Sequence, residues 1–212
     1  MSSWAIVPVK GFDHGKSRLM PALAPTARRA LAIALFRRVL RACAGCTAID
    51  HVLIASDSVH MITHVLTPAT RTRTSLLLDR GPSQPFAKVL DAALAHAHAR
   101  GATRAVIAMG DLPLIEPRDV AELVAALAHA AVVVAPDRMR RGVGAVGCTL
   151  PAPLPMQLGH RDSFDRTLAA ARAHGARVAL VHNPRIAHDL DTGADLESLG
   201  LSEPPLAALV RA

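Results

Sequence analysis

Residues 105–113 read Ala-Val-Ile-Ala-Met-Gly-Asp-Leu-Pro, an apolar run that ends in a polar turn. The run over Ala105–Met109 has the length of a buried strand, and Pro117 suits the first position of a helix. Short apolar runs alternate with longer Ala-, Leu- and Arg-rich segments in the rest of the chain as well. This alternation predicts an α/β fold, Rossmann-like, with a mostly parallel sheet and helices on both faces.

The 212 residues contain no repeat and no linker, which predicts a single domain over residues 1–212. Strands are predicted at Ala5–Val9, Val52–Ala55, Leu76–Leu78, Ala105–Met109, Ala131–Ala135 and Val178–Val181. Helices are predicted over Ala27–Ala42, Ser58–Leu66, Ala87–Ala99 and Ser163–His174, from Pro117, and in a short stretch after a polar turn at Asp189–Asp195. Gly142–Gly147 is predicted to be a loop, Asp162 a helix cap, and the segment around Pro204 a strap or a loose end.

The chain is strongly basic, with 24 Lys and Arg against 17 Asp and Glu and a formal net charge of +7. Such a charge suits either nucleic acid or a small phosphorylated ligand. Aromatic residues make up only 2% of the chain, which disfavours single-stranded nucleic acid because its bases stack on aromatic rings. Cys43 and Cys46 form one Cys-x-x-Cys pair without the further Cys or His that a zinc site needs.

The loop after the first strand holds two of the three lysines, Lys10 and Lys16. A lysine ammonium is a compact charge that reaches a phosphate, so this loop is a candidate for binding one. Its Gly-Lys-Ser resembles a P-loop, but only three residues separate Gly11 from Gly15 where a Walker A loop needs four. Since Ala105–Asp111 could pass as a Walker B strand, a small P-loop kinase stays open as an alternative.

Carboxylates follow two of the predicted strands. Asp111 ends the strand quoted above, and Asp189 and Asp191 stand two residues apart, so they point the same way if the segment is extended. In such a sheet ligands bind where strands end, and three carboxylates there can hold Mg²⁺ together with phosphate oxygens. The set is compatible with nucleotidyl transfer onto a phosphate, because a phosphate is already ionised at neutral pH and needs no general base.

Several motifs, taken in order, resemble the CofC family of guanylyltransferases in the biosynthesis of the deazaflavin coenzyme F-420. They cover residues 4–196, and no single motif is specific without the others. The motifs are Trp4–Lys10, Gly15–Leu19, Val89–Leu94, Gly110–Ile115, Ala135–Arg138 and Asp189–Thr192 with Asp195-Leu196. The resemblance implies a MobA-like nucleotidyltransferase fold and the transfer of GMP from GTP to 2-phospholactate, phosphoenolpyruvate or 3-phosphoglycerate, with release of pyrophosphate.

The resemblance also implies roles for individual residues. Nucleotide contacts would fall on Pro8, Lys10, Lys16, Asp91 and Asp111, with Lys10, Lys16 and Asp111 as catalytic residues. The family's Mg²⁺ carboxylates would fall on Asp111, Asp189 and Asp191, the residues that the strand ends indicate independently. The acceptor side would fall on Val143, Gly144, His160, Arg161 and Ser163.

Departures from the family pattern gather on the acceptor side. The usual Gly-Thr-Asn-Ala-Leu reads Gly142-Val143-Gly144-Ala145-Val146, Asp91 stands where Asn is usual, and His160 and Arg161 precede Ser163. We expect a glycine-lined wall that admits a bulkier acid, with His160 or Arg161 on an added polar group. This expectation slightly favours 3-phosphoglycerate as the acceptor.

The expected partners are GTP and a phosphorylated three-carbon acid, with neither nucleic acid nor a membrane, and a homodimer is left open. No apolar run approaches the roughly 18–20 residues of a membrane span. The N-terminal residues carry no signal-peptide pattern, so we expect a cytoplasmic protein. Two further alternatives to the guanylyltransferase stay open: the kinase above and a nonenzymatic binder of nucleotide or nucleic acid.

Overall fold

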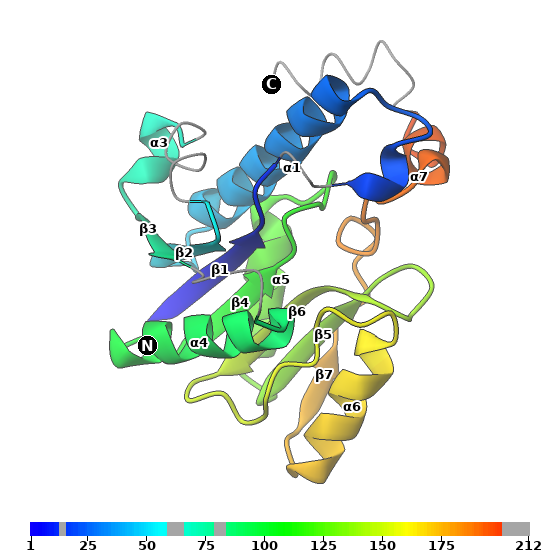
Figure 1. Ribbon diagram of the computed structural model, residues 1–212. Helices are drawn as coiled ribbons and strands as arrows, with labels where there is room; N and C mark the ends of the chain where they lie inside the picture. The colour runs from blue at the N-terminus through cyan, green and yellow to red at the C-terminus, as the bar shows by residue number, and fades with distance from the viewer. Residues whose placement is uncertain (13–15, 59–65, 79–83, 201–212) are drawn as a thin grey trace.

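The computed structural model describes residues 1–12, 16–58, 66–78 and 84–200 (Figure 1). Its centre is one sheet of seven strands in the order β3-β2-β1-β4-β6-β5-β7. The strands are β1 Ser3–Val9, β2 His51–Ser56, β3 Thr74–Leu78, β4 Arg104–Ala108, β5 Val132–Pro136, β6 Val143–Thr149 and β7 Val178–Leu180. All neighbouring pairs are parallel except those of β6, which runs antiparallel to both β4 and β5.

Helices cover both faces of this sheet (Figure 1). They are α1 Pro25–Gly45, α3 Pro68–Arg71, α4 Phe86–Ala99, α5 Pro117–Ala126, α6 Ser163–Ala173 and α7 Gly193–Ser198, with a short 3-10 helix, η1, at Ser17–Leu19. One apolar cluster joins α1 and α5 to the sheet, and a second joins α4 and α6 to its other face. The predicted α/β architecture is therefore confirmed.

The prediction of a loop at Gly142–Gly147 is wrong, because these residues form most of β6. Glycine is a weak strand former, so its density in the sequence favoured a loop. In the sheet its small size serves packing: a Cβ on Gly144 would come within 2.5 Å of the Ile186 carbonyl oxygen. A Cβ on Gly147 would come within 3.2 Å of Leu127. The absence of a Cβ at these two glycines thus allows Ile186 and Leu127 to pack directly against β6.

The predicted helix cap at Asp162 is confirmed in position only, and two other local predictions fall outside the described residues. Asp162 does stand at the N-cap of α6, but its side chain makes no capping hydrogen bond and instead accepts one from Arg166 Nε at 2.8 Å. The predicted helix at Ser58–Leu66 falls largely on residues 59–65, outside the described part of the chain, as does the segment around Pro204. Among the residues described, no helix is both long and apolar enough to cross a bilayer.

The cysteines are packing residues in this fold. Cys43 lies in the last turns of α1, Cys46 directly follows that helix, and Cys148 lies in β6; all three are buried and form no disulfide. Burial and the neighbouring Cys46 raise the pKa of the Cys43 thiol to about 12. A thiol with that pKa remains protonated and inert near neutral pH.

Candidate active site

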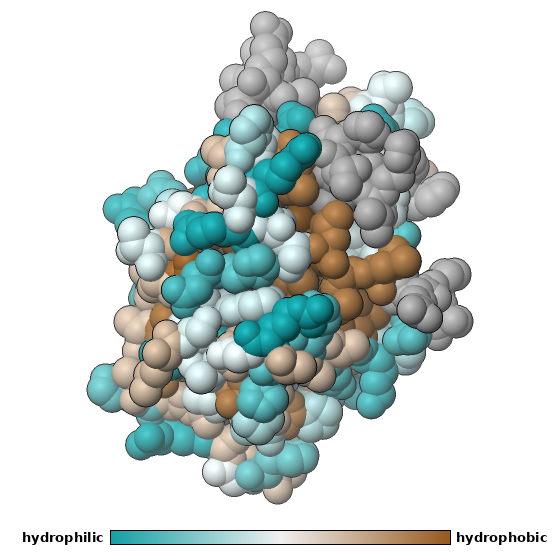
Figure 2. All heavy atoms as spheres, turned by 90° about the vertical axis from the view of Figure 1, so that its left-hand side faces the viewer, coloured by the Kyte–Doolittle hydropathy of each residue, from teal (hydrophilic) through white to brown (hydrophobic). Residues whose placement is uncertain are grey.

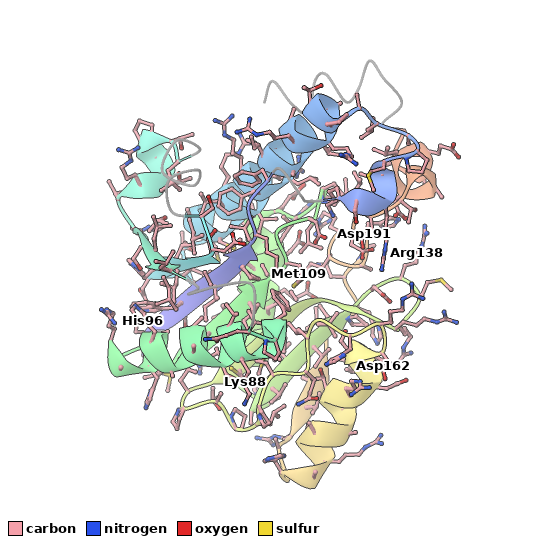
Figure 3. The ribbon with its side chains drawn as sticks, viewed as in Figure 1. Lys88, His96, Met109, Arg138, Asp162 and Asp191 are labelled. Carbon is pink, nitrogen blue, oxygen red and sulfur yellow. The ribbon has the colours of Figure 1, made fainter. Side chains whose placement is uncertain are left out.

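A cavity of about 210 Å³ opens at the carboxyl ends of β1 and β4. It gathers residues far apart in sequence, among them the predicted Pro8, Lys10, Lys16 and Asp111. The remaining lining residues are Val9, Gly11, Phe12, Ala32, Phe86, Met109 and Gly110. Figure 3 shows Met109 and Asp191 at this end of the sheet. Parallel strands end at one edge, which is why the loops after β1 and β4 meet here.

Lys16 lies at the centre of the charged groups. Its Nζ is 2.8 Å from Asp111 Oδ2 and 2.9 Å from Asp191 Oδ1, and its side chain is only 9% exposed. Burial by itself would lower the pKa of Lys16, but the two carboxylates raise it above its ordinary value. The ammonium is therefore charged at neutral pH and holds together carboxylates from two separate loops.

Asp189 belongs to the same electrostatic cluster. Burial, followed by the negative charges of Asp111 and Asp191, raises its pKa to about 6. The three predicted carboxylates thus act on one another, and a cation would relieve their repulsion. Within the described ranges, however, no group of three or more His, Cys, Asp or Glu side chains is arranged to hold a metal ion by itself.

Apolar packing brings the loop of Lys16 against the loop of Asp191. Leu19 of η1 and Leu190 are both fully buried in one small cluster with Leu31 and Leu35 of α1. The Leu190 amide also donates to the Asp111 carbonyl oxygen at 3.3 Å. These contacts hold η1, which follows Lys16, and the backbone next to Asp191 in place, which supports the ion pairs of Lys16.

The loop after β1 is tied to its neighbour by a residue that the sequence analysis missed. Asp57, directly after β2, accepts a hydrogen bond from the Gly11 amide at 2.8 Å. Lys10, next to Gly11, is exposed and lines the cavity. A carboxylate after a strand was the only sequence signal for Asp57, and the same signal had identified Asp111.

The geometry after Lys16 differs from a P-loop. In a P-loop a long helix begins at the Gly-Lys-Ser itself, so that its first amides bind phosphate. Here Lys16 has a left-handed backbone with φ of 57°, only the three-residue η1 follows, and α1 begins at Pro25. This arrangement disfavours the kinase alternative.

Asp91 lies outside the Lys16 cavity. Its Oδ1 accepts a hydrogen bond from the Met156 amide at 2.8 Å. It lines a different cavity of about 480 Å³ between α4 and the proline-rich segment 151–155. The carboxylate thus has a structural partner that explains its position without a nucleotide.

The residues assigned to the acceptor side are only partly exposed. Val143 is buried in the core, Gly144 faces Ile186, and Ser163 is buried at the start of α6. His160 and Arg161 are exposed just before that helix. The glycine-lined wall is not open, because a Cβ on Gly142 would also meet the protein, 2.7 Å from the Asp137 carboxylate.

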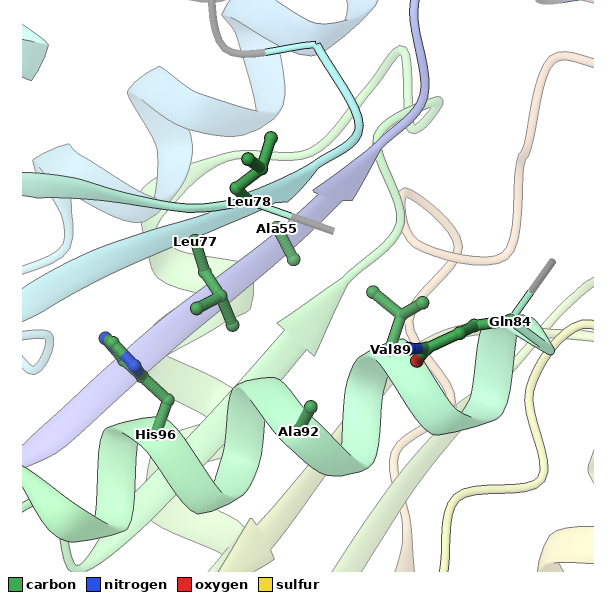
Figure 4. A pocket seen from close by; sticks show the side chains of 7 residues that line it. All are labelled: Ala55, Leu77, Leu78, Gln84, Val89, Ala92 and His96. Carbon is green, nitrogen blue, oxygen red and sulfur yellow. The ribbon is translucent and has the colours of Figure 1, made fainter. Parts of the chain in front are cut away.

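A third cavity, of about 250 Å³, lies between α4 and the strands β2 and β3 (Figure 4). Ala55, Leu77 and Val89 give it apolar walls, and Gln84 and His96 provide polar atoms at its two ends. Figure 2 shows a hydrophobic area on this side of the molecule. Leu78, which also lines the cavity, is 51% exposed. Two of its lining residues, Val89 and Ala92, fall in the Val89–Leu94 motif, while the others come from β2, β3, the segment before α4 and the end of that helix. The sequence analysis did not predict a cavity from these separate stretches.

Comparison with known proteins identifies the family to which the chain is similar. The model of a family described as "Guanylyl transferase CofC like" matches residues 3–202. The phosphoenolpyruvate guanylyltransferase of Chloroflexus aggregans is 34% identical over 208 residues, covering 94% of this chain and 97% of that protein. The 2-phospho-L-lactate guanylyltransferase of Methanothermobacter thermautotrophicus is 28% identical over 197 residues, covering 92% of this chain and 83% of that one.

The fold also matches a solved structure. A protein of Desulfovibrio desulfuricans G20, provisionally named a nucleotide-diphospho-sugar transferase, superposes with a TM-score of 0.79. The match covers 100% of this chain and 98% of that one at 20% identity, so it concerns the fold alone. The predicted nucleotidyltransferase fold and enzyme class are confirmed. With a family match over nearly all its residues and a relative at 34% identity, the chain belongs to the CofC-like guanylyl transferase family.

Proposed function

We propose that the protein transfers GMP from GTP to the phosphate of a small phosphorylated three-carbon acid. The observation that carries this proposal is the Lys16 ammonium, which is paired with both Asp111 and Asp191 and lines the same cavity as Lys10. Cations and carboxylates are thus within reach of one another where two polyanionic substrates have to meet. The names of the relatives support the same activity, and the family resemblance supports a role in deazaflavin coenzyme biosynthesis.

The proposed reaction is a single displacement at phosphorus. An oxygen of the acceptor phosphate attacks the α-phosphorus of GTP, and a new P–O bond forms. The bond from the α-phosphorus to the bridging oxygen breaks, and pyrophosphate leaves with the electron pair. Since the second pKa of a phosphate monoester is about 6, the nucleophile is ionised at neutral pH and no general base is required. The enzyme's task is to position two anions and offset their repulsion.

Lys16 and Lys10 are the proposed phosphate ligands. Lys16 is charged and held by carboxylates that would exchange it for a divalent cation, which would free the ammonium to donate to a phosphate oxygen. Lys10 is exposed at the cavity and needs no such exchange. In this proposal both lysines neutralise charge and transfer no proton.

Asp111, Asp189 and Asp191 are the proposed ligands of Mg²⁺. Burial, followed by the charges of Asp111 and Asp191, raises the pKa of Asp189 to about 6, and a bound cation would offset both effects. Carboxylate oxygen is the donor that Mg²⁺ prefers. Because these residues do not form a closed site alone, phosphate oxygens and water would supply the remaining ligands. When bound, Mg²⁺ would neutralise charge on the phosphates.

The cavity between β3 and α4 is our candidate for the base of GTP. It pairs apolar walls with a few polar atoms, the pattern typical of small-molecule sites. Val89 lines it and Phe86, one helical turn earlier, lines the Lys16 cavity, so the two cavities are neighbours along α4. A nucleotide could therefore contact both.

For the acceptor we propose phosphoenolpyruvate ahead of 2-phospholactate and 3-phosphoglycerate. The preference for 3-phosphoglycerate depended on an open glycine wall, whereas Gly142 and Gly144 both face the protein's own atoms. The name of the Chloroflexus relative supports phosphoenolpyruvate. His160 and Arg161 remain candidates for contacts with the acid.

A competition experiment tests the proposal. The enzyme is incubated with GTP, Mg²⁺ and equal amounts of the three acids, and the products are separated by mass. We expect a guanylyl diphospho-acid and an equal amount of pyrophosphate, with the phosphoenolpyruvate product in excess. Release of GDP would indicate a kinase, and GTP that stays intact would exclude both activities.

A further inference from the structure

Asp119, on α5, is a buried carboxylate that binds two separate segments of the chain. Its side chain is 1% exposed. Oδ2 accepts hydrogen bonds from the Glu116 amide at 2.9 Å and from Arg185 Nε at 2.8 Å. Oδ1 accepts one from Asn183 Nδ2 at 2.9 Å, and the Arg185 Nη2 also donates to it. These donors lie at the start of α5 and in the segment after β7.

The first of these segments carries Asp111. It runs from Asp111 to Glu116, with Leu112 and Ile115 buried in the core. The bond from the Glu116 amide to Asp119 is half of a capping box, which fixes where α5 begins. The position of α5 therefore fixes the end of the loop on which Asp111 stands.

The second segment carries Asp189 and Asp191. Asn183 Oδ1 accepts from the amides of Arg185 at 2.9 Å and Ile186 at 3.3 Å, which folds the backbone into a tight turn. Ile186 is fully buried, and its carbonyl oxygen packs against Gly144. Asp189 follows three residues after Ile186, so the turn held by Asp119 determines where the carboxylates begin.

We propose that Asp119 is a positioning residue that sets the separation between Asp111 and the pair Asp189 and Asp191. The inference rests on the proposed function, because it concerns the same carboxylates. The two segments also contact each other directly, because the Leu190 amide donates a hydrogen bond to the Asp111 carbonyl oxygen at 3.3 Å. They are therefore joined at two places: at Asp119 and at this hydrogen bond. Asp119 lines neither the Lys16 cavity nor the cavity between β3 and α4, so in this proposal it touches no substrate.

A purely structural role explains the network less well. Burial of an ion pair is a weak source of stability, because the cost of desolvation offsets much of the attraction. Burial would raise the pKa of Asp119, yet the bonds from Arg185 and Asn183 lower it below the ordinary value. The carboxylate thus remains ionised with directional bonds, and such bonds specify geometry better than apolar contacts do.

The test compares Asp119→Asn with a variant destabilised elsewhere. Leu94→Ala removes a buried leucine of α4 on the opposite face of the sheet. Both are assayed well below their thermal midpoints, with circular dichroism as the check on folding. The readouts are kcat, the KM for GTP and the dissociation constant of Mn²⁺ in the presence of the α,β-methylene analogue of GTP.

We expect Asp119→Asn to weaken Mn²⁺ binding and lower kcat by about 10- to 100-fold, the usual effect of losing a residue that orients metal ligands. Leu94→Ala should lower the thermal midpoint and leave kcat and the dissociation constant of Mn²⁺ unchanged. If Asp119→Asn does not fold, Asn183→Ala serves instead, with a smaller loss in the same two constants. If a folded Asp119→Asn or Asn183→Ala enzyme keeps the wild-type kcat and Mn²⁺ dissociation constant, the inference about Asp119 is overturned while the proposed function is not affected. A wild-type enzyme that neither transfers GMP nor binds Mn²⁺ would overturn the proposed function as well.

Discussion

The ammonium nitrogen of Lys16 lies 2.8 Å from Asp111 Oδ2, and the two residues are 95 positions apart in the chain. The same nitrogen lies 2.9 Å from Asp191 Oδ1. One buried cation therefore joins the loop after β1, the loop after β4 and the segment before α7. In the proposed function, a divalent cation would bind the same carboxylates that this ammonium now joins.

Lys16→Met should remove most of the activity. The variant keeps the length of the side chain but loses the charge, so we expect kcat to fall by about 10²- to 10³-fold, the size of effect seen when a preorganised charge stabiliser is lost. Steady-state kinetics with saturating GTP measure it. Lys88→Met, whose lysine is 69% exposed on α4, is the matched control and should keep wild-type kcat. A Lys16→Met enzyme with wild-type kcat would remove Lys16 from the mechanism.

Asp111→Asn should abolish Mg²⁺-dependent turnover and leave the fold intact. The amide has the same shape but cannot offer a charged oxygen to a cation. Circular dichroism should match the wild type, while turnover at every Mg²⁺ concentration falls to background. Asp165→Asn, an exposed carboxylate of α6, is the control and should behave as the wild type. Undiminished turnover in Asp111→Asn would exclude Asp111 from the site.

The pH dependence should follow Asp189. Burial and the neighbouring carboxylates raise its pKa from 3.8 to about 6. Since a cation binds the ionised form, the apparent Mg²⁺ affinity should fall as pH drops below about 6. Titrations of activity with Mg²⁺ between pH 5 and 8 would reveal this, and an affinity that does not change with pH would contradict the assignment.

The same shift predicts a stability effect of opposite sign. A carboxyl group with a raised pKa in the folded state stabilises the fold at pH below 3.8, and that contribution is lost as pH rises through about 6. Without metal, Asp189→Asn should therefore melt at a higher temperature than the wild type near neutral pH. The difference should vanish near pH 4. A variant that melts lower at neutral pH would show that Asp189 is not under repulsion.

Asp91 should be needed for stability more than for nucleotide binding. Asp91→Ala loses the acceptor for the Met156 amide, and we expect a cost of about 1 kcal/mol in the free energy of unfolding. Asp91→Asn keeps an acceptor oxygen and should lose less. The KM for GTP should stay within about twofold of the wild type in both. A tenfold rise in that KM with unchanged stability would support a base contact instead.

The cavity of Figure 4 can be tested by filling it. Ala92 lines it, and Ala92→Leu should raise the KM for GTP about tenfold, because a larger side chain takes up space that the base needs. The value of kcat should change little. Ala95→Leu is the control, because Ala95 is on the same helix but lines the cavity beside Asp91. Equal KM values in the two variants would place the base elsewhere.

Periodicity predicted most of the fold because strands and helices here bury regular apolar faces. It failed for β6, where Gly144 and Gly147 suit close packing against Ile186 and Leu127. Neither contact partner lies near β6 in the sequence. Local composition therefore cannot distinguish this strand from a loop.

The candidate site was predictable where a motif follows a strand, as with Lys16 and Asp111. The partners of Asp119 were not, because Asn183 and Arg185 join it from more than 60 residues away. Asp57 was missed for a similar reason, since its bond to Gly11 spans two strands. Long-range polar contacts leave no periodic trace in one sequence.

The central claim is that this site transfers GMP to an acceptor phosphate. Phosphorus NMR of one reaction containing enzyme, GTP, Mg²⁺ and phosphoenolpyruvate tests it directly, because every phosphorus atom is followed at once. The account predicts paired signals of a new asymmetric diphosphate together with an equal amount of pyrophosphate, both absent with Asp111→Asn. Signals of GDP and inorganic phosphate, or a new diphosphate that forms equally well with Asp111→Asn, would contradict it.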